Sequence, residues 1–578
     1  MIFLKNILCF SILFIIHDVG AQTNLLDNGD FESSCSGLGN WICMGGCTLT
    51  PNGDARTGSL SMQVSNRDAN WKGLAQFVNV DGGSRYKLTA FVKLLNIANN
   101  KTYQDVQLIM KCEDENETAK YMKFGKTPLV QAGQWYEVGG VRKINEGLHT
   151  CRFYVSTEAH TDYLVDDASL VFVTEDPDWR IKANDRIKQH RKADITVRMT
   201  GDYAESTSLD IELQQTKHEF IFGSVVRAAL LEDDDLNLPY QKVFYENYEW
   251  SVLGNALKWK QMQRKENFID YPTPLTAMNT LASKGILLRC HCAVWGVDER
   301  VPDWVKLLKG QDLIDAVAER IEGVVNQTKG LCEHWDVNNE MLHGDFFERE
   351  SGNPDITMDM FRQIHKWDDH PTLFLNDYNV ISNCDVAVAM KDTAVRFQQA
   401  GVPIGGIGVQ GHMRDIDLTL VQARLDILAE ADLPIVITEF AVNEINDTLK
   451  AEKLVDLMTI FFGHPSIDGV VFWGFWDGQI WEPEAAKFTG KNVEPNAAGL
   501  AYQELYQNTW RTRDFQTLRG LEEYTVTGFK GDYLLKVKHG GEILLTQEFQ
   551  LSDEGIDLEI HLNGTSGGSP SVSHVLVS

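Results

Sequence analysis

Residues 404–440 are IGGIGVQGHMRDIDLTLVQARLDILAEADLPIVITEF, and this stretch decides the fold. It contains a short apolar run at Ile404–Val409, a segment at Leu418–Glu430 with apolar residues at helical spacing, and a second apolar run at Pro434–Thr438. Two buried strands on either side of an amphipathic helix form a β-α-β unit. The stretch therefore predicts parallel strands that are connected by helices.

The same alternation extends over residues 220–512. Further apolar runs occur at Phe220–Val226, Ile286–Trp295, His334–Val337, Thr372–Leu375 and Asp468–Phe475. Repeated strand–helix units over a segment of this length predict an α/β fold of the (β/α)8 TIM-barrel type. An open doubly wound sheet is the alternative. It usually has a glycine-rich phosphate loop after its first strand, and none follows residues 220–226.

The segments on either side of the predicted barrel have a different pattern. Residues 22–173 contain short alternating runs, such as 61–64 and 86–92, which predict a β-sandwich. Residues 174–219 are expected to be a connector with a basic helical stretch from Trp179 to Lys192. Residues 513–578 predict a small β appendage with a flexible tail at 564–571.

The charge of the chain restricts its partners. The formal net charge is −29 over 578 residues, so nucleic acids and anionic membranes would be repelled. An uncharged or weakly charged polymer is compatible with this charge. We expect a monomer.

Residues 1–21 predict a secretory signal peptide. Lys5 precedes an apolar run at Ile7–Ile16, and small residues come before a cleavage site at Gln22. We therefore expect a secreted, extracellular protein that is soluble after cleavage. Five glycosylation sequons agree with this prediction: Asn100, Asn116, Asn326, Asn446 and Asn563.

Nine cysteines remain after Cys9 is removed with the signal peptide. In an oxidising compartment some of them should pair, and an odd number leaves at least one thiol or an intermolecular bond. The sequence leaves their pairing open. Cys290, His291 and Cys292 alternate faces on a strand, so they are not expected to bind zinc together.

Polar residues cluster where the predicted barrel strands end. Examples are His291, Trp295, Asn339, Gln410 and Thr438. The carboxyl ends of all eight strands of such a barrel face one mouth, where active sites form. These residues are therefore expected to converge although they are far apart in the sequence.

Glu340 and Glu439 are the candidate catalytic residues. They are 99 positions apart, a spacing that fits strands four and seven on opposite sides of the mouth. Two carboxylates on either side of a glycosidic bond are sufficient for hydrolysis, one as a proton donor and one as an ionised nucleophile. From spacing alone, two ion-pair partners at the barrel rim are the alternative.

The neighbouring residues favour the catalytic interpretation. Asn339 can hydrogen-bond a sugar hydroxyl, and His412 can hold Glu439 ionised. Trp295, Trp473 and Trp481 offer flat apolar faces for pyranose rings, although core packing is the alternative for each of them.

Residues 220–510 resemble glycoside hydrolase family 10, the retaining endo-β-1,4-xylanases. The matching segments are FIFGS (220–224), NALKW (255–259), LLRCHCAVW (287–295), WDVNNEMLHG (335–344), LFLNDYNV (373–380), GIGVQGHM (406–413), IVITEF (435–440) and WGFWD (473–477). The resemblance implies Glu340 as acid/base, Glu439 as nucleophile and no cofactor for catalysis. It implies sugar contacts from Asn255, Lys258, His291, Trp295, Asn339, Tyr378, Gln410, His412, Trp473 and Trp481.

The sequence departs from the family pattern at two positions. Gly254 stands where the family commonly has Glu, and Gly296 stands where it commonly has His. Both positions are on the glycone side, so they put the affinity of those subsites in doubt.

Residues 24–173 resemble carbohydrate-binding modules of families four, nine and twenty-two through NGDFE (28–32), SNRDANWKG (65–73) and YLVDDASL (163–170). The resemblance implies a jelly-roll sandwich with a glycan groove. Its candidate sugar contacts are Arg67, Trp71, Tyr121 and Glu158. Glu32 and Asp167 are candidate ligands for a structural calcium ion.

The expected substrate is xylan. Two alternatives stay open: the same chemistry on cellulose or mixed-linkage glucan, and a glycan-binding protein whose barrel has little or no activity.

Overall fold

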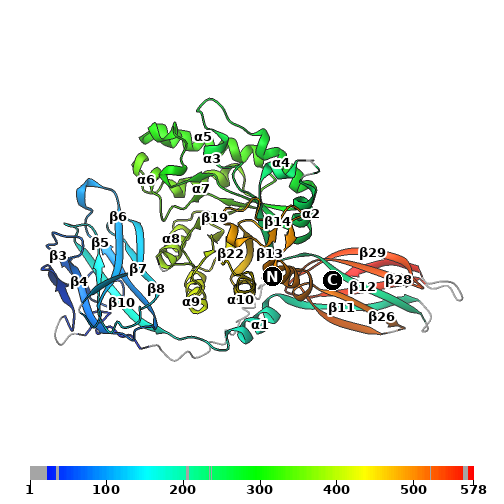
Figure 1. Ribbon diagram of the computed structural model, residues 1–578, viewed down its shortest axis with the longest axis horizontal. Helices are drawn as coiled ribbons and strands as arrows, with labels where there is room; N and C mark the ends of the chain where they lie inside the picture. Colours follow the sequence, from blue (N-terminus) through cyan, green and yellow to red (C-terminus); the bar gives the residue numbers. More distant parts are fainter. Residues whose placement is uncertain are drawn as a thin grey trace, which may run out of the picture.

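The computed structural model describes residues 23–33, 38–116, 118–202, 207–232, 235, 237–383, 385–520, 522–563 and 571–578. The predicted signal peptide, most of the predicted tail, Cys35 and Cys384 lie outside these residues. Figure 1 shows an N-terminal β-sandwich, a central barrel and a second β-sandwich near the C-terminus.

The N-terminal sandwich has two five-stranded antiparallel sheets. One sheet has the order β1-β4-β9-β6-β7, and the other has the order β2-β3-β10-β5-β8. The strands are β1 (Ile42–Met44), β2 (Thr48–Asn52), β3 (Ser61–Ser65), β4 (Gly73–Asn79), β5 (Arg85–Leu94), β6 (Gln104–Glu113), β7 (Ala119–Val130), β8 (Trp135–Lys143), β9 (Thr150–Ser156) and β10 (Tyr163–Val173). Side chains alternate between core and surface along them, as in β6.

Eight parallel strands of the described chain close the barrel, which confirms the predicted (β/α)8 fold. In chain order they are β13 (Ile221–Val226), β14 (Trp250–Leu253), β15 (Leu287–Cys290), β17 (His334–Asp336), β19 (Thr372–Asp377), β20 (Gly406–Val409), β22 (Ile435–Val442) and β23 (Ile467–Phe472). Pairing of β13 with β23 and of β20 with β22 closes the ring.

Helices surround this ring. They are α2 (Leu238–Asn247), α3 (Trp259–Met262), α4 (Pro272–Ser283), α5 (Gly310–Thr328), α6 (Phe346–Ser351), α7 (Ile356–Trp367), α8 (Ala387–Gln399), α9 (Leu418–Ala429), α10 (Asp447–Gly463) and α11 (Ala497–Gln503). Every residue of β22 is buried, since the packed barrel interior covers one face and helices cover the other. Local signals start the helices; for example, the side chain of Asp417 caps α9.

Residues 174–219, expected as a connector, form regular structure. They contain α1 (Trp179–His190), β11 (Lys192–Asp202) and β12 (Ser208–His218). β11 lies between β27 and β30, and β12 lies between β26 and β28. The C-terminal strands are β26 (Arg513–Arg519), β27 (Glu523–Phe529), β28 (Gly531–His539), β29 (Glu542–Leu551), β30 (Ile556–Asn563) and β31 (Ser571–Val577). The C-terminal unit is therefore a sandwich of two four-stranded sheets. The segment before the barrel and the segment after it both contribute strands to each sheet.

Three disulfides join Cys43 to Cys47, Cys112 to Cys151, and Cys290 to Cys332. Among the described cysteines only Cys292 is free, and it is buried. Cys290 is therefore held in a disulfide, whereas Cys292, two residues further along the chain, keeps its thiol. Within the residues that the structure describes, no helix is both long and apolar enough to cross a bilayer.

Candidate active site

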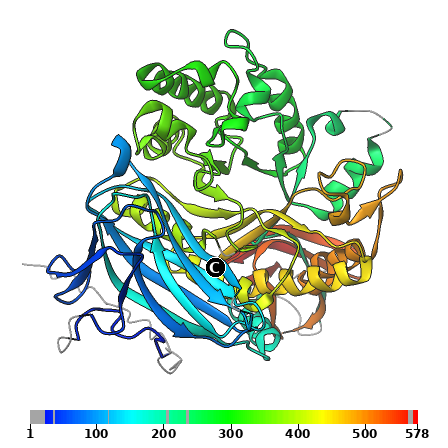
Figure 2. The ribbon, with the colours of Figure 1, turned by 60° about the vertical axis from the view of Figure 1, so that its left-hand side comes forward.

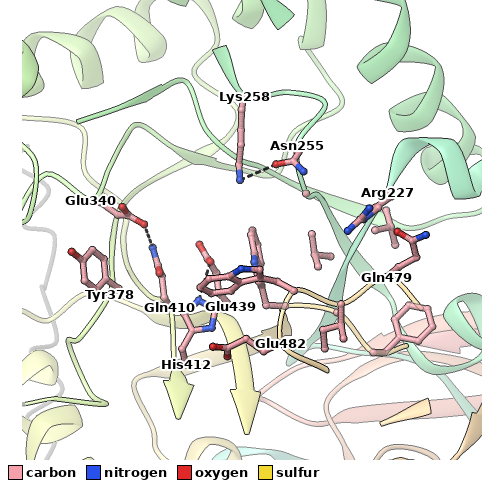
Figure 3. A pocket seen from close by; sticks show the side chains of 18 of the residues that line it. Arg227, Asn255, Lys258, Glu340, Tyr378, Gln410, His412, Glu439, Gln479 and Glu482 are labelled. Atoms are coloured by element: carbon pink, nitrogen blue, oxygen red, sulfur yellow. Dashed lines mark hydrogen bonds and ion pairs between the residues drawn. The ribbon is translucent and has the colours of Figure 1, made fainter. Parts of the chain in front are cut away.

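A cavity of about 760 Å³ contains most of the predicted site residues. Its lining includes Asn255, Lys258, Trp295, Glu340, Tyr378, Gln410, His412, Glu439, Trp473 and Trp481. In Figure 3, Glu340 and Tyr378 lie at one end and Arg227 and Gln479 at the other, with Glu439 between them. The convergence of strand ends at one mouth brings these distant residues together.

Glu340 follows β18 (Asn338–Asn339) and lies at a sharp backbone turn. Its φ of +61° is in the left-handed region, which costs a non-glycine residue about 1 kcal/mol or more. Gln410 Nε2 donates a hydrogen bond of 2.8 Å to its Oε1, and Trp295 Nε1 donates one of 2.8 Å to its Oε2. These contacts fix the orientation of the carboxyl group.

The surroundings of Glu340 favour its protonated form. Burial raises the pKa of its carboxyl group, and the charges of Asp377 and Glu439 raise it further. The hydrogen bonds from Gln410 and Trp295 oppose this effect but do not cancel it. A carboxyl group with a raised pKa can serve as a proton donor near neutral pH.

Glu439 lies within β22 and is only 5% exposed. Burial raises the pKa of its carboxyl group, but the hydrogen bond from His412 and the charges of His291, His412 and Lys258 together hold it below the usual value. The distance from His412 Nε2 to Glu439 Oε2 is 3.3 Å, and Asn376 Nδ2 donates to Oε1 at 3.5 Å. Glu439 is therefore kept ionised.

The two predicted contacts outside the cavity lining are buried next to it. His291 is 2% exposed and contacts the rings of Trp295 and Trp473. Asn339 accepts a hydrogen bond of 2.9 Å from Asn376, and among the described residues its Nδ2 has no partner. That unpaired donor is suited to a sugar hydroxyl.

Asp336 and Arg289 are supporting residues that the sequence reasoning missed. Asp336 Oδ2 is 2.8 Å from His291 Nδ1, and its other oxygen accepts a hydrogen bond from Arg289. All three residues are buried, so the pair holds the His291 ring in one orientation. Asp336 belongs to the WDVNNE segment that ends at Glu340, and this proximity in the sequence could have indicated its role.

Aromatic and cationic groups form one part of the cavity wall. Lys258 Nζ lies 4.7 Å from the centre of the Trp295 ring and 5.5 Å from that of Trp473. Burial lowers the pKa of Lys258. At the end of the cavity that also holds Glu340, Tyr378 stacks on His343 with ring centroids 3.8 Å apart. Trp481 is 69% exposed and its ring lies 5.7 Å from that of His412, so its flat face is open to a ligand.

Sequence comparison matches the model of glycosyl hydrolase family 10 to residues 212–508. The chain belongs to this family. Residues 23–163 match a carbohydrate binding domain, so this family 10 glycoside hydrolase carries an N-terminal carbohydrate-binding module.

Two plant relatives match over most of the chain. Endo-1,4-beta-xylanase 3 of Arabidopsis thaliana is 26% identical over 94% of this chain and 74% of its own length. Endo-1,4-beta-xylanase 1 of the same plant is 26% identical over 94% of this chain, which spans 58% of that relative. The solved xylanase 10B of Thermotoga petrophila RKU-1 covers 50% of this chain at 21% identity, with a TM-score of 0.47.

The two departures from the family 10 pattern have different local surroundings. A Cβ atom at Gly296 would come within 2.5 Å of the carbonyl oxygen of Gly344, so a larger residue needs a displaced loop. At Gly254 the nearest neighbour of such an atom is Val225 at 3.2 Å. Gly254 lines the cavity next to Arg227, which the sequence analysis did not select.

The structure corrects the expectation for Arg67 in the module. Arg67 is 2% exposed, and its guanidinium group donates to the backbone carbonyls of Lys72, Glu158, Thr161, Asn70 and Thr157. It holds loops together and does not reach the surface. Trp71 and Tyr121 are 49% and 64% exposed, while Glu158 pairs with Lys101 at 2.5 Å.

The candidate calcium ligands have protein partners. Glu32 Oε1 accepts from the backbone N–H groups of Ser59 and Leu60, and Asp167 pairs with Arg56 at 2.7 Å. Within the described residues no group of three or more His, Cys, Asp and Glu residues is arranged to hold a metal ion. Both carboxylates therefore have structural partners in the protein.

A row of exposed and partly exposed side chains crosses the β1-β4-β9-β6-β7 sheet of the module. The strand registers place Phe77, Arg152, Lys111 and Tyr121 side by side. Phe77 is 58% exposed, and the Arg152 guanidinium lies 5.2 Å from its ring centre. Only Tyr121 was predicted from the sequence, because the alignment of the other three depends on long-range pairing.

Proposed function

We propose that this family 10 glycoside hydrolase is a secreted, retaining endo-β-1,4-xylanase. The observation that carries the proposal is the pair Glu340 and Glu439, which face one cavity and have pKa values displaced in opposite directions. The carboxyl group with the raised pKa is suited to be the acid, and the one with the lowered pKa is suited to be the nucleophile.

In the first step the carboxylate of Glu439 attacks the anomeric carbon. Glu340 gives its proton to the glycosidic oxygen as the bond from that oxygen to the anomeric carbon breaks. The fragment on the reducing-end side leaves, and the remaining sugar is esterified to Glu439. In the second step Glu340 removes a proton from water, which attacks the same carbon and releases the sugar with its original anomeric configuration. The two glutamates need no cofactor for this chemistry.

The wall of the cavity supports a neutral sugar chain as substrate. Trp295 and Trp473 provide apolar faces, and Asn255 and Lys258 provide polar groups near them. A few polar groups among aromatic side chains are typical of sites that orient a ligand.

The first test compares Glu340→Gln and Glu439→Gln with the exposed control Glu322→Gln on soluble xylan. Each catalytic variant should lose at least about 100-fold in kcat, because general acid–base or nucleophilic assistance disappears. The control should keep its activity. Near-normal turnover by either catalytic variant would remove that residue from the mechanism.

Product analysis separates the mechanism and substrate alternatives. Proton NMR of the first product should show the retained β-anomer, whereas an α-anomer would indicate inversion. Rates on xylan and carboxymethylcellulose, measured side by side, distinguish xylan from glucan as substrate. Binding to xylan without release of reducing sugar would favour a protein that only binds glycans.

The module is assigned to glycan binding through the row of Phe77, Arg152, Lys111 and Tyr121. Phe77→Ala and Tyr121→Ala should each weaken retardation in xylan affinity gels, because flat apolar faces are lost. Phe515→Ala, in the C-terminal sandwich, is a matched control because Phe515 is 57% exposed. Equal mobility of all three variants would contradict this assignment.

Secretion depends on residues 1–21. The full chain should appear in the culture medium of a eukaryotic host with Gln22 as its N-terminus. A protein that stays in the cells with residues 1–21 attached would contradict this part of the proposal.

A further inference from the structure

The N-terminal module is held firmly against the barrel. Lys391 on α8 pairs with Glu137 on β8, and the side chains of this pair are 12% and 10% exposed. Arg85 pairs with Asp417 at 2.7 Å, and Tyr103 donates a hydrogen bond of 2.7 Å to Asp345. Figure 2 shows the blue and cyan strands of the module beside the barrel helices.

Apolar packing and buried hydrogen bonds reinforce this interface. Val141 of the module clusters with Val388, Leu420 and Ile427 of helices α8 and α9. Arg424 donates to the backbone carbonyl of Val141 at 3.0 Å. Such contacts fix the module in one position relative to the barrel.

Several of these contacts involve loops at the mouth of the barrel. Asp345 follows β18, and Asp417 follows β21 (His412–Met413). Asp385 follows β19; its backbone carbonyl accepts a hydrogen bond from the backbone N–H of Lys126, and its side chain pairs with Lys123. The loops that follow the strands also form the catalytic cavity. The module is therefore placed along one side of the active-site mouth.

A crevice of about 170 Å³ lies between the module and these loops. Arg142 and Lys143, at the end of β8, line it from the module. From the barrel it is lined by Ile381, Ser382, Asn383, Met413, Asp415, Asp417, Leu420, Val421 and Arg424. Ser382 also lines the catalytic cavity, so the crevice adjoins that cavity.

The crevice adjoins the end of the cavity from which the leaving group departs. Glu340 gives its proton to the leaving oxygen, so the departing part of the substrate lies on the side of Glu340. Figure 3 shows Tyr378 beside Glu340, at the end opposite Arg227 and Gln479. Asn379 and Ser382 follow Tyr378 in the chain and line the same cavity.

We propose that the crevice is a distal binding site for the reducing-end part of a β-1,4-linked glycan. The inference rests on the proposed function and makes the module part of the substrate cleft. A chain that leaves the cavity past Tyr378 and Ser382 enters the crevice and contacts Lys143 and Asp415. Both side chains are on exposed residues, and their polar groups can hydrogen-bond sugar hydroxyls.

The volume of the crevice sets the length of chain that it holds. A space of about 170 Å³ corresponds to about five or six water molecules in the liquid. This accommodates roughly one pyranose unit. The crevice therefore contributes to substrates that extend past the catalytic cavity and not to short ones.

The test compares the double variant Lys143→Ala/Asp415→Ala with the wild-type full chain. The matched control is Lys188→Ala/Asp185→Ala, which removes one exposed lysine and one exposed aspartate from α1. The substrates are linear β-1,4-xylo-oligosaccharides of four and eight units, labelled at the reducing end. The readouts are kcat/KM and the length of the labelled product.

The crevice variant should lose about tenfold in kcat/KM on the octamer, since two hydrogen bonds to sugar are removed. On the tetramer it should stay within about twofold of the wild type. Its labelled product from the octamer should become shorter, because fewer units are held on the leaving-group side. Equal losses on both lengths, or no loss on the octamer, would overturn the proposal.

A binding measurement separates the crevice from the catalytic proposal. In the Glu439→Gln background, calorimetry with the same oligosaccharides reports affinity without hydrolysis. The crevice variant should bind the octamer about tenfold more weakly and the tetramer unchanged. If the wild type fails to cleave but this difference persists, the xylanase proposal fails and the binding site stands. If the difference is absent, the binding site fails.

Discussion

His412 is the residue whose replacement tests the electrostatics of the site most directly. Its Nε2 lies 3.3 Å from Glu439 Oε2. Burial raises the pKa of the Glu439 carboxyl group, and the hydrogen bond from His412 is the largest influence that lowers it. A hydrogen bond to a charged group is worth about 1.5–3 kcal/mol, and one pKa unit corresponds to about 1.4 kcal/mol. His412→Ala should therefore raise the pKa of Glu439, because the ionised form loses a stabilisation of about 1.5–3 kcal/mol.

The sign of the effect on activity follows from the role of Glu439. The nucleophile must be ionised, so activity is lost as the pH falls through its pKa. Since His412→Ala raises that pKa, the acid limb of the pH profile should move to higher pH. On xylan, whose leaving group needs a proton, the basic limb reports protonated Glu340 and should move little. His291 and Lys258 continue to favour the ionised form of Glu439 in the variant, which limits the movement of the acid limb.

The assay is kcat/KM against pH on an aryl xylo-oligosaccharide with a good leaving group. Such a substrate needs little help from Glu340, so the acid limb reports Glu439. The control is His370→Ala, because His370 contacts Glu333 at 3.1 Å on the exposed surface. If His412→Ala lowers kcat/KM by the same factor at every pH, His412 acts only on sugar binding and the electrostatic argument is refuted.

Three further variants test other parts of the structure. Asp377→Asn removes a charge that raises the pKa of Glu340, so the basic limb of kcat/KM on xylan should move to lower pH; an unmoved limb would contradict this. Loss of the disulfide in Cys290→Ser/Cys332→Ser should lower the free energy of unfolding by about 4 kcal/mol for a loop of 42 residues, measured by urea denaturation; an unchanged midpoint would refute the estimate. Gly296→His should lower stability by about 1–3 kcal/mol, since its Cβ meets Gly344, and tighter substrate binding with unchanged stability would contradict this.

The barrel and the position of the residues proposed as catalytic could be predicted from the sequence for a physical reason. Each strand is a short buried run, and its polar end marks the mouth of the barrel. Gln410 after β20 and Glu439 within β22 follow this pattern. The parallel arrangement places such ends together without any knowledge of side-chain contacts.

Other features depend on contacts between distant residues. Arg67 has a local context typical of a surface loop, and only the fold shows that backbone carbonyls surround its guanidinium group. Phe77, Arg152 and Lys111 align only when three strands pair in the observed register. The crevice at Ser382 needs two domains in contact, which no local pattern encodes.

The interleaved C-terminal sandwich has a consequence for how the chain is made and shortened. Arg198 on β11 and Glu559 on β30 are paired although 361 positions separate them. During synthesis, β11 and β12 leave the ribosome before the strands with which they pair. Until those strands follow, their backbone N–H and C=O groups have no partners and can pair with another chain, which leads to aggregation. In a fragment that stops at Trp510, the edges of β11 and β12 would stay unpaired permanently. A shortened catalytic fragment should therefore lose β11 and most of β12 together with the C-terminal strands, and should keep His218, which bonds Glu249 of the barrel.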